Sequence, residues 1–169
     1  ALSKMATGGL LFVIIPSPVM FREKGFREWR KNMLRSHSLR VVIKLPEDLF
    51  YPVGVHTSGV IIEAGKAHDF DQDVLWASMD DGYRKQKSVM KPKKQGNIKD
   101  MLEKVHSTLD NHSFKSVARQ WILKPIEQDK FIECAPEQYL EDIDMSKEDI
   151  LNGMRTVLTN ALASRLFSL

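Results

Sequence analysis

The sequence of 169 residues contains a single cysteine, Cys134. One cysteine excludes a disulfide within the chain and a zinc site built on cysteines. The longest apolar run, residues 10–15, is far shorter than the roughly 20 residues that a membrane helix needs. We therefore expect no membrane partner and a cytoplasmic protein in a reducing compartment.

The chain also lacks the short motifs that mark most active sites. Gly8 and Gly9 precede an apolar run, whereas the glycines of a dinucleotide-binding loop follow a strand. The five histidines are scattered, and no His/Asp cluster has metal-ligand spacing. We predict no catalytic residue, no cofactor-binding residue and no metal site. Because the chain starts without Met, we also expect a fragment of a larger protein.

Charge is unevenly distributed, although the formal net charge is only +3. Residues 84–94 contain six basic side chains and no acidic one, whereas residues 127–149 are strongly acidic. A basic strip of this kind either contacts the phosphates of DNA without reading its sequence or is a solvated loop. The DNA backbone contacts would come from Arg84, Lys85, Lys87, Lys91, Lys93 and Lys94.

Hydrophobic periodicity predicts an α/β fold. Residues 10–16, LLFVIIP, are typical of a strand buried on both faces in a parallel sheet. A helix follows, with Phe26, Trp29 and Met33 on its apolar stripe. Residues 39–45 alternate like a strand that is covered more fully on one face. Strand, helix and strand at this spacing form a crossover unit.

The second half of the chain contains further strands and helices. The segments 55–66 and 73–79 fit two strands, residues 114–123 fit a helix or a strand, and Pro136 begins a short helix. A last helix keeps an apolar stripe from 150 to 166. The helix at 97–111 has these apolar residues on one stripe: Ile98, Met101, Leu102, Val105 and Leu109.

The connection FYPVGVHTSG raises the clearest functional question. With about ten residues, it is long for a hairpin, whose loop usually has 2 to 5 residues. In one interpretation Phe50 and Val53 cover the edge of the sheet and Gly54 makes a turn. In the other, the loop is part of a binding site.

Several ordered segments resemble the N6-adenine DNA methyltransferases of type I restriction-modification systems and the related fused restriction-methylase enzymes. The resemblance covers about residues 5 to 105 and rests on GGLLFVIIPSPVMF, on FREWRKNMLRSHSLRVVIKLPEDLF with its LP..lF ending, on GVHTSGVIIEAGK and on DDGYRKQKSVMKPKKQGNIKDML. The resemblance implies the C-terminal half of a Rossmann-like class I methyltransferase sheet with mixed strands, followed by a mainly helical tail.

The resemblance also implies what is missing. Such enzymes hold S-adenosylmethionine over a glycine-rich loop and position the target adenine with an (N/D)PP(Y/F) motif, and neither motif occurs in this sequence. We expect S-adenosylmethionine to bind the intact parent enzyme and not this fragment, which would be inactive alone. The family places the loop described above beside the target base, so the loop residues that would contact the base are Phe50, Tyr51, His56 and Thr57.

The remaining expectations concern partners and domains. In this family the last helices of the modification subunit pack against a specificity subunit or a fused specificity domain. Here the partner helix would use Ile150, Met154, Val157, Leu158 and Leu162, although the same stripe also fits a core. We assign residues 1–83 to the late strands and helix of the methyltransferase core, 84–112 to a basic loop and helix, and 113–169 to a helical extension. The alternative is a noncatalytic module that binds nucleic acid or protein.

Overall fold

The structure of the protein is a computed structural model that describes residues 1–46, 49–50, 54–79, 83–86, 89–92, 97–128 and 132–141. The predicted final helix, including Ile150, Met154, Val157, Leu158 and Leu162, lies outside the described residues. The elements are η1 (Leu2–Lys4), β1 (Leu10–Pro16), α1 (Pro18–Phe21), α2 (Gly25–Ser36), β2 (Ser38–Lys44), β3 (Thr57–Glu63), β4 (Asp73–Ser78), β5 (Tyr83–Gln86), β6 (Val89–Pro92), α3 (Ile98–Leu109), β7 (Trp121–Pro125) and α4 (Pro136–Glu141).

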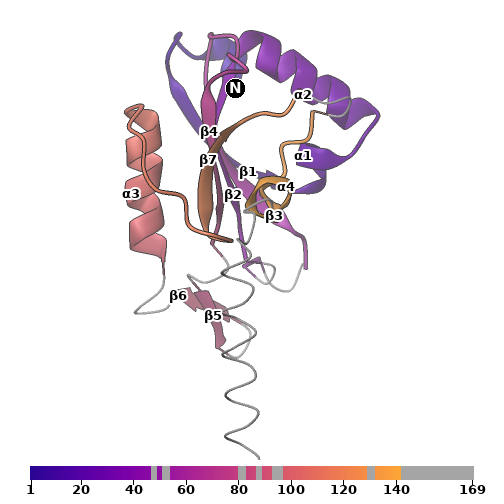
Figure 1. Ribbon diagram of the computed structural model, residues 1–169. Helices are drawn as coiled ribbons and strands as arrows, with labels where there is room; N and C mark the ends of the chain where they lie inside the picture. Colours follow the sequence, from indigo (N-terminus) through magenta and orange to yellow (C-terminus); the bar gives the residue numbers. More distant parts are fainter. Residues whose placement is uncertain are drawn as a thin grey trace, which may run out of the picture.

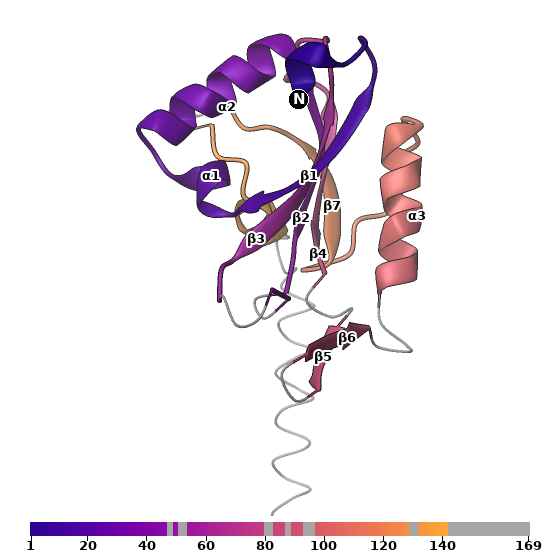
Figure 2. The ribbon, with the colours of Figure 1, turned by 180° about the vertical axis from the view of Figure 1, so that it is seen from behind.

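Five strands form one mixed sheet in the order β1-β3-β2-β4-β7. β2 and β4 pair in parallel, and the other neighbours pair antiparallel. Helices α1, α2 and α4 cover one face of the sheet and α3 covers the other (Figures 1 and 2). The α/β fold class is therefore confirmed.

A hydrophobic core lies on each face of the sheet. On the α2 and α4 face, the Trp76 and Tyr139 rings stack with their centroids 3.8 Å apart, and both side chains are fully buried. On the α3 face, Met101 and Val105 pack over Leu75. Both faces of β2 are buried, so the prediction that one face of this strand is covered more fully was wrong. The reason is its position in the middle of the sheet, between two layers of helices.

The apolar strand β1 lies at an edge of the sheet. Among the described strands it pairs only with β3, in the antiparallel direction, and every second side chain is exposed. The prediction of a parallel strand buried on both faces was therefore wrong. Leu10, Phe12 and Ile14 are 49%, 58% and 43% exposed. Within the described part of the chain, no strand pairs with the outer edge of β1, and no helix covers these three side chains.

The apolar stripe predicted for α2 is buried only in part. Met33 is buried, but Phe26 and Trp29 are 41% and 39% exposed. The side of the helix that faces the sheet carries Leu34 and, unexpectedly for a charged residue, Arg30. On α3, Met101 and Val105 are buried as predicted, while Leu102 is 52% exposed.

The structure settles the ambiguous segment before residue 125 and corrects the prediction of a loop in the basic block. The end of the ambiguous segment 114–123 belongs to strand β7 (Trp121–Pro125), which pairs with β4. Within the basic block, predicted as a loop, β5 and β6 pair as an antiparallel hairpin with Arg84 opposite Lys91. Among the described helices, none has the length and apolar character needed to cross a membrane.

Candidate functional site at the carboxyl ends of the parallel strands

Three strands end on the same side of the sheet. β1 and β2 both run antiparallel to β3, and β4 runs parallel to β2. The carboxyl ends of β1, β2 and β4 therefore point the same way, toward the lower end of the sheet in Figure 1. Open α/β sheets bind their ligands beyond this end. The connection from β2 to β3, in which the sequence predicts target-base contacts, lies at this end as well.

A cavity of about 660 Å³ opens beside this connection. Its walls come from three separate parts of the chain: the end of β1 with α1, the residue before β3, and the segment that leads into α4. The lining residues are Ser17, Pro18, Phe21, Arg22, His56, Glu133, Ala135, Glu137 and Gln138.

Short hydrogen bonds join the walls formed by β1 and β3. The Ser17 amide donates to the His56 carbonyl at 2.9 Å, which continues the β1–β3 ladder past Pro16. The hydroxyl groups of Ser17 and Ser58 lie 3.0 Å apart, and both residues are buried. These contacts fix His56 at the rim of the cavity.

Arg30 of α2 holds the other two walls, which are α1 and the segment before α4, through hydrogen bonds to their backbone carbonyls. Its side chain is fully buried in α2, and its guanidinium donates to the carbonyls of Val19 (2.8 Å), Arg22 (2.9 Å) and Phe21 (3.5 Å) at the end of α1. It also donates to the Ile132 carbonyl at 2.8 Å. A single cation thus holds both α1 and the segment before α4, because carbonyls at the end of a helix accept hydrogen bonds from positive groups.

The cavity lining is mixed in charge and contains one aromatic ring. Arg22 is the basic side chain and Glu133 and Glu137 are acidic, with the Glu137 carboxylate 3.9 Å from the Lys44 ammonium. Phe21 is 40% exposed. An aromatic face with hydrogen-bond donors and acceptors around it suits a planar polar ligand such as a nucleobase. Among the described residues, no group of three His, Cys, Asp or Glu side chains is placed to hold a metal ion.

The structure describes three of the four predicted loop residues and places them in different surroundings. His56 lines the cavity, Phe50 is 42% exposed in the same connection, and Tyr51 lies outside the described residues. Thr57 is buried, and its hydroxyl oxygen has no hydrogen-bond partner in the described part of the chain. Since side chains alternate along a strand, Thr57 faces away from Ser58 and from the wall that Ser58 supports.

The predicted DNA-backbone residues are only partly described. Lys85 on β5 and Lys91 on β6 are exposed. Arg84 belongs to β5 by its backbone. Lys87, Lys93 and Lys94 lie outside the described residues.

Sequence reasoning missed most of the cavity. Ser17 and Arg22 follow a recognisable strand, but nothing in their pattern marks them as lining residues. Glu133 and Glu137 belong to the acidic stretch, which reads as a solvated surface. The only signal in the sequence was the run PSP after β1, because prolines at a strand end shape the turn that carries Ser17 and Phe21.

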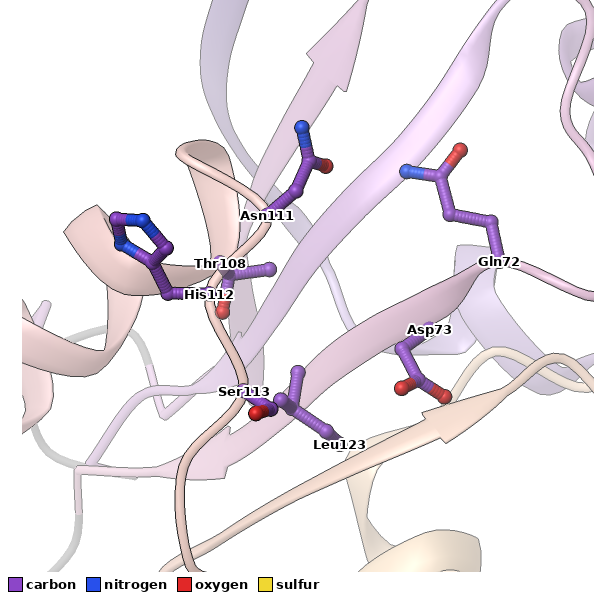
Figure 3. Close-up of a pocket in the computed structure, with 7 residues that line it drawn as sticks. All are labelled: Gln72, Asp73, Thr108, Asn111, His112, Ser113 and Leu123. Carbon is purple, nitrogen blue, oxygen red and sulfur yellow. The ribbon is translucent and has the colours of Figure 1, made fainter.

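A second, smaller cavity of about 230 Å³ lies at the opposite end of the sheet, where β4 begins at Asp73. Figure 3 shows its lining residues. Arg40 organises one side of this region, since its guanidinium binds the Glu63 carboxylate at 2.7 Å, the Thr108 carbonyl at 2.8 Å and the Asn111 side-chain oxygen at 2.8 Å. The cavity is lined by Gln72, Asp73, Thr108, Asn111, His112, Ser113 and Leu123. Arg40 ties the end of α3 to strands β2 and β3.

Comparison with known protein families gives a match over most of the chain. The sequence model described as "N-6 DNA Methylase" matches residues 1–147. A curated relative is the "Type II restriction enzyme and methyltransferase RM.BcgI" of Heyndrickxia coagulans. It is 34% identical over 91 residues, which make up 53% of this chain and 14% of that protein.

Solved structures share the fold at low sequence identity. The methyltransferase subunit of a type I restriction-modification system from Streptococcus thermophilus gives a TM-score of 0.55 at 19% identity, over 79% of this chain and 24% of that chain. A structure described in terms of the complex assembly and conformational transition of the type I restriction-modification system gives 0.53 at 17% identity, over 96% and 35%. The chain thus spans from 14% to 35% of the length of these relatives.

Proposed function

Because this chain belongs to the N-6 DNA methylase family, we propose that it is the later part of the methyltransferase domain of a longer DNA adenine-N6 methyltransferase from a restriction-modification system. Its role is to form the target-base side of the cleft and to contact DNA. The observation that carries this proposal is the cavity at the carboxyl ends of β1, β2 and β4, which His56 of the predicted loop lines. Phe50 of the same loop is 42% exposed.

A base that is to be methylated on its amino group must leave the duplex, so the enzyme needs a face to stack on and polar groups for the base edge. Phe50 and Phe21 are both about two-fifths exposed at this end of the sheet. The serine, glutamate and glutamine side chains of the cavity supply donors and acceptors. Arg30 acts on the base only indirectly, by fixing the two segments that carry Phe21 and Glu133.

Within the described part of the chain, the residues that follow the parallel strands do not fit a site for S-adenosylmethionine. The three segments that follow β1, β2 and β4 contain at most one glycine each. In the turn after β1, the Ser17 amide already donates to the His56 carbonyl and Pro18 has no N–H, so these two residues offer no amide to a cofactor. We propose that the cofactor binds residues of the longer protein outside this chain, and that the 169-residue chain alone does not methylate DNA.

The β5–β6 hairpin supports the proposed contact with DNA. Its register places the backbone of Arg84 opposite that of Lys91, so this short hairpin brings two basic positions together. Basic residues that are close together suit the phosphates of DNA. The hairpin follows β4 after four residues, so it cannot be far from the end of the sheet at which the cavity opens. We extend the proposal to the predicted helix at 150–166, as the surface for a specificity subunit or domain.

The first experiment measures S-adenosylmethionine binding and adenine methylation by the purified 169-residue chain. We expect neither activity. Micromolar binding of the cofactor or methylated product from the chain alone refutes the proposal that essential parts lie elsewhere.

The second experiment uses the longer protein and tests the loop. Phe50→Ala should lower methylation by roughly tenfold or more while it lowers stability little, because the ring is partly exposed. Leu102→Ala is the matched control, since this apolar side chain is also half exposed but lies on α3. Equal losses of activity and stability in Phe50→Ala assign the loop to a structural role.

The third experiment measures DNA affinity against salt concentration. Replacing the six basic residues of 84–94 by Gln should weaken binding and flatten the slope of log K against log salt by about 0.9 for each phosphate contact that is lost. Lys4→Gln together with Lys99→Gln provides the control, because both lysines are exposed and lie outside the hairpin. Unchanged binding removes the hairpin from the DNA contact surface. Salt-sensitive binding by a chain whose longer form never methylates DNA favours the alternative, a noncatalytic binding module.

A further inference from the structure

Glu133 differs from the other acidic residue that lines the larger cavity. The Glu137 carboxylate lies 3.9 Å from the Lys44 ammonium, whereas the Glu133 carboxylate forms no ion pair or hydrogen bond within the described part of the chain. The backbone of Glu133 is engaged, because its carbonyl accepts a hydrogen bond from the Tyr139 hydroxyl at 2.9 Å. The cavity therefore contains a half-buried carboxylate whose oxygens can accept hydrogen bonds from a ligand.

Two further hydrogen bonds of 2.8 Å hold the backbone before and after Glu133. Before it, the Arg30 guanidinium donates to the Ile132 carbonyl. After it, the Cys134 amide donates to the Met20 carbonyl of α1. Arg30, Met20 and Cys134 are fully buried. A side chain on a backbone that is held in this way keeps its place in the wall, which a selective hydrogen bond to a ligand requires.

The residue before Glu133 has a strained backbone. Ile132 adopts a positive φ of 50°, in the left-handed region that β-branched residues rarely enter. Such a conformation persists only where the surrounding structure enforces it, and conformations of this kind gather at binding and catalytic sites. Here the buried Arg30 and the bond between Cys134 and Met20 enforce it. The strain lies directly before the free carboxylate, which points to a function for the position of Glu133.

We infer that Glu133 selects the base that enters the cavity, by accepting a hydrogen bond from the exocyclic amino group of that base. This inference rests on the proposed function, in which the cavity receives a base that has left the duplex. An ionised carboxylate only accepts hydrogen bonds. Adenine and cytosine present an amino group where guanine and thymine present a carbonyl oxygen. Glu133 thus attracts the first two bases and repels the other two.

The remaining polar side chains of the cavity do not make this distinction. Ser17, His56 and Gln138 can each donate or accept a hydrogen bond, so each can bind an amino group or a carbonyl oxygen. Glu137 is already in an ion pair. Glu133 is therefore the specificity-determining residue among the described lining residues.

The first experiment titrates the 169-residue chain with adenosine and with inosine, and follows the NMR signal of the Cys134 amide. The two nucleosides differ in one group of the purine ring, which is an amino group in adenosine and a carbonyl in inosine. We expect affinities of about millimolar, because a nucleoside fills only part of a cleft, and roughly fivefold tighter binding of adenosine. Glu133→Gln should bring the ratio of the two affinities to about one, because an amide both donates and accepts.

Glu103→Gln is the matched control. It removes the same charge at an exposed position of α3, on the other face of the sheet, and should keep the preference for adenosine. The thermal midpoint of Glu133→Gln should equal that of the wild type, since the Glu133 carboxylate has no partner to lose. A wild type that binds both nucleosides equally, or an unchanged ratio in Glu133→Gln, overturns the inference.

Methylation by the longer protein separates this inference from the proposed function. Glu133→Gln should slow single-turnover methylation of adenine roughly tenfold, whereas Glu103→Gln should leave the rate unchanged. A longer protein that methylates adenine equally well with Glu133→Gln refutes the role of Glu133 and keeps the proposed function. A longer protein that methylates no DNA, together with a chain that prefers adenosine through Glu133, refutes the proposed function and keeps the base-selective cavity.

Discussion

Arg30 offers the most direct test of how this fold holds its cavity. We predict that Arg30→Met lowers the free energy of unfolding by about 4 kcal/mol, which is a large share of the 5–15 kcal/mol typical of a domain. The guanidinium makes three hydrogen bonds of 2.8–2.9 Å, to the carbonyls of Val19, Arg22 and Ile132. A hydrogen bond to a charged group contributes about 1.5–3 kcal/mol. The three hydrogen bonds together contribute several kcal/mol, and all three are lost in the variant. Because the methionine side chain recovers part of the packing of arginine, we expect a net loss of about 4 kcal/mol.

The assay is urea unfolding followed by tryptophan fluorescence, because Trp76 and Trp121 are buried and report the loss of the core. Arg35→Met is the matched control: the same substitution, in the last turn of the same helix, at an exposed position. It should cost less than about 1 kcal/mol, the range of a favourable helix-end charge. If Arg30→Met and Arg35→Met unfold at the same urea concentration, the buried guanidinium does not hold α1 and the segment before α4 as described.

Two further substitutions test other parts of the fold. Burial lowers the pKa of His68 from 6.5 to about 4, an effect that Asp69 opposes in part and Arg40 reinforces. As the pH falls, the unfolded chain therefore binds a proton at this histidine before the folded protein does. The contribution to stability should be complete above pH 6.5 and should fall by up to roughly 3 kcal/mol as the pH drops toward 4. Urea midpoints of the wild type and His68→Gln at pH 7.5 and 4.5 check this, and an equal pH dependence of both proteins contradicts it. Gly65 adopts φ +71° and a Cβ there would lie 2.8 Å from the Thr7 hydroxyl oxygen and 3.1 Å from its Cα, so Gly65→Ala should cost about 2 kcal/mol, and an unchanged thermal midpoint would show that this turn relaxes freely.

The fold was predictable from the sequence where the information is local. The strands β1 to β4, helix α3 and the start of α4 at Pro136 follow from periodicity and from proline position, which depend on neighbouring residues only. The order of the strands does not, because β3 inserts between β1 and β2 through pairings that no local pattern specifies. Segment 114–123 was ambiguous for a related reason: Trp121 and Ile122 fit either period, and the choice of strand depends on the open edge of β4.

The candidate site was predictable to a smaller extent. The family resemblance identified the connection between β2 and β3, and His56 does line the cavity. The opposite wall could not be predicted from local sequence, because it depends on contacts between distant residues. Arg30 and Ile132 are 102 positions apart in the chain, and Ser17 and Ser58 are 41 apart. A buried arginine on a helix is also indistinguishable in sequence from an exposed one, since its partners are backbone carbonyls with no side-chain signature.

Most of the side chains that are more exposed than predicted gather in one place, whereas β2 and Arg30 are more buried than predicted. Ten large apolar side chains of the described residues are exposed. Five of them flank the outer edge of β1: Leu10, Phe12, Ile14, Phe26 and Trp29. Phe21, Phe50 and Val55 lie in α1 or between β2 and β3, and Leu102 and Val117 lie on α3 and before β7. Random departures from an amphipathic pattern would scatter over both faces of the sheet and both of its ends. Hydrophobic periodicity reflects the environment in which a sequence was selected, so a clustered excess of exposed apolar residues at one edge supports the proposal that this chain is part of a longer protein.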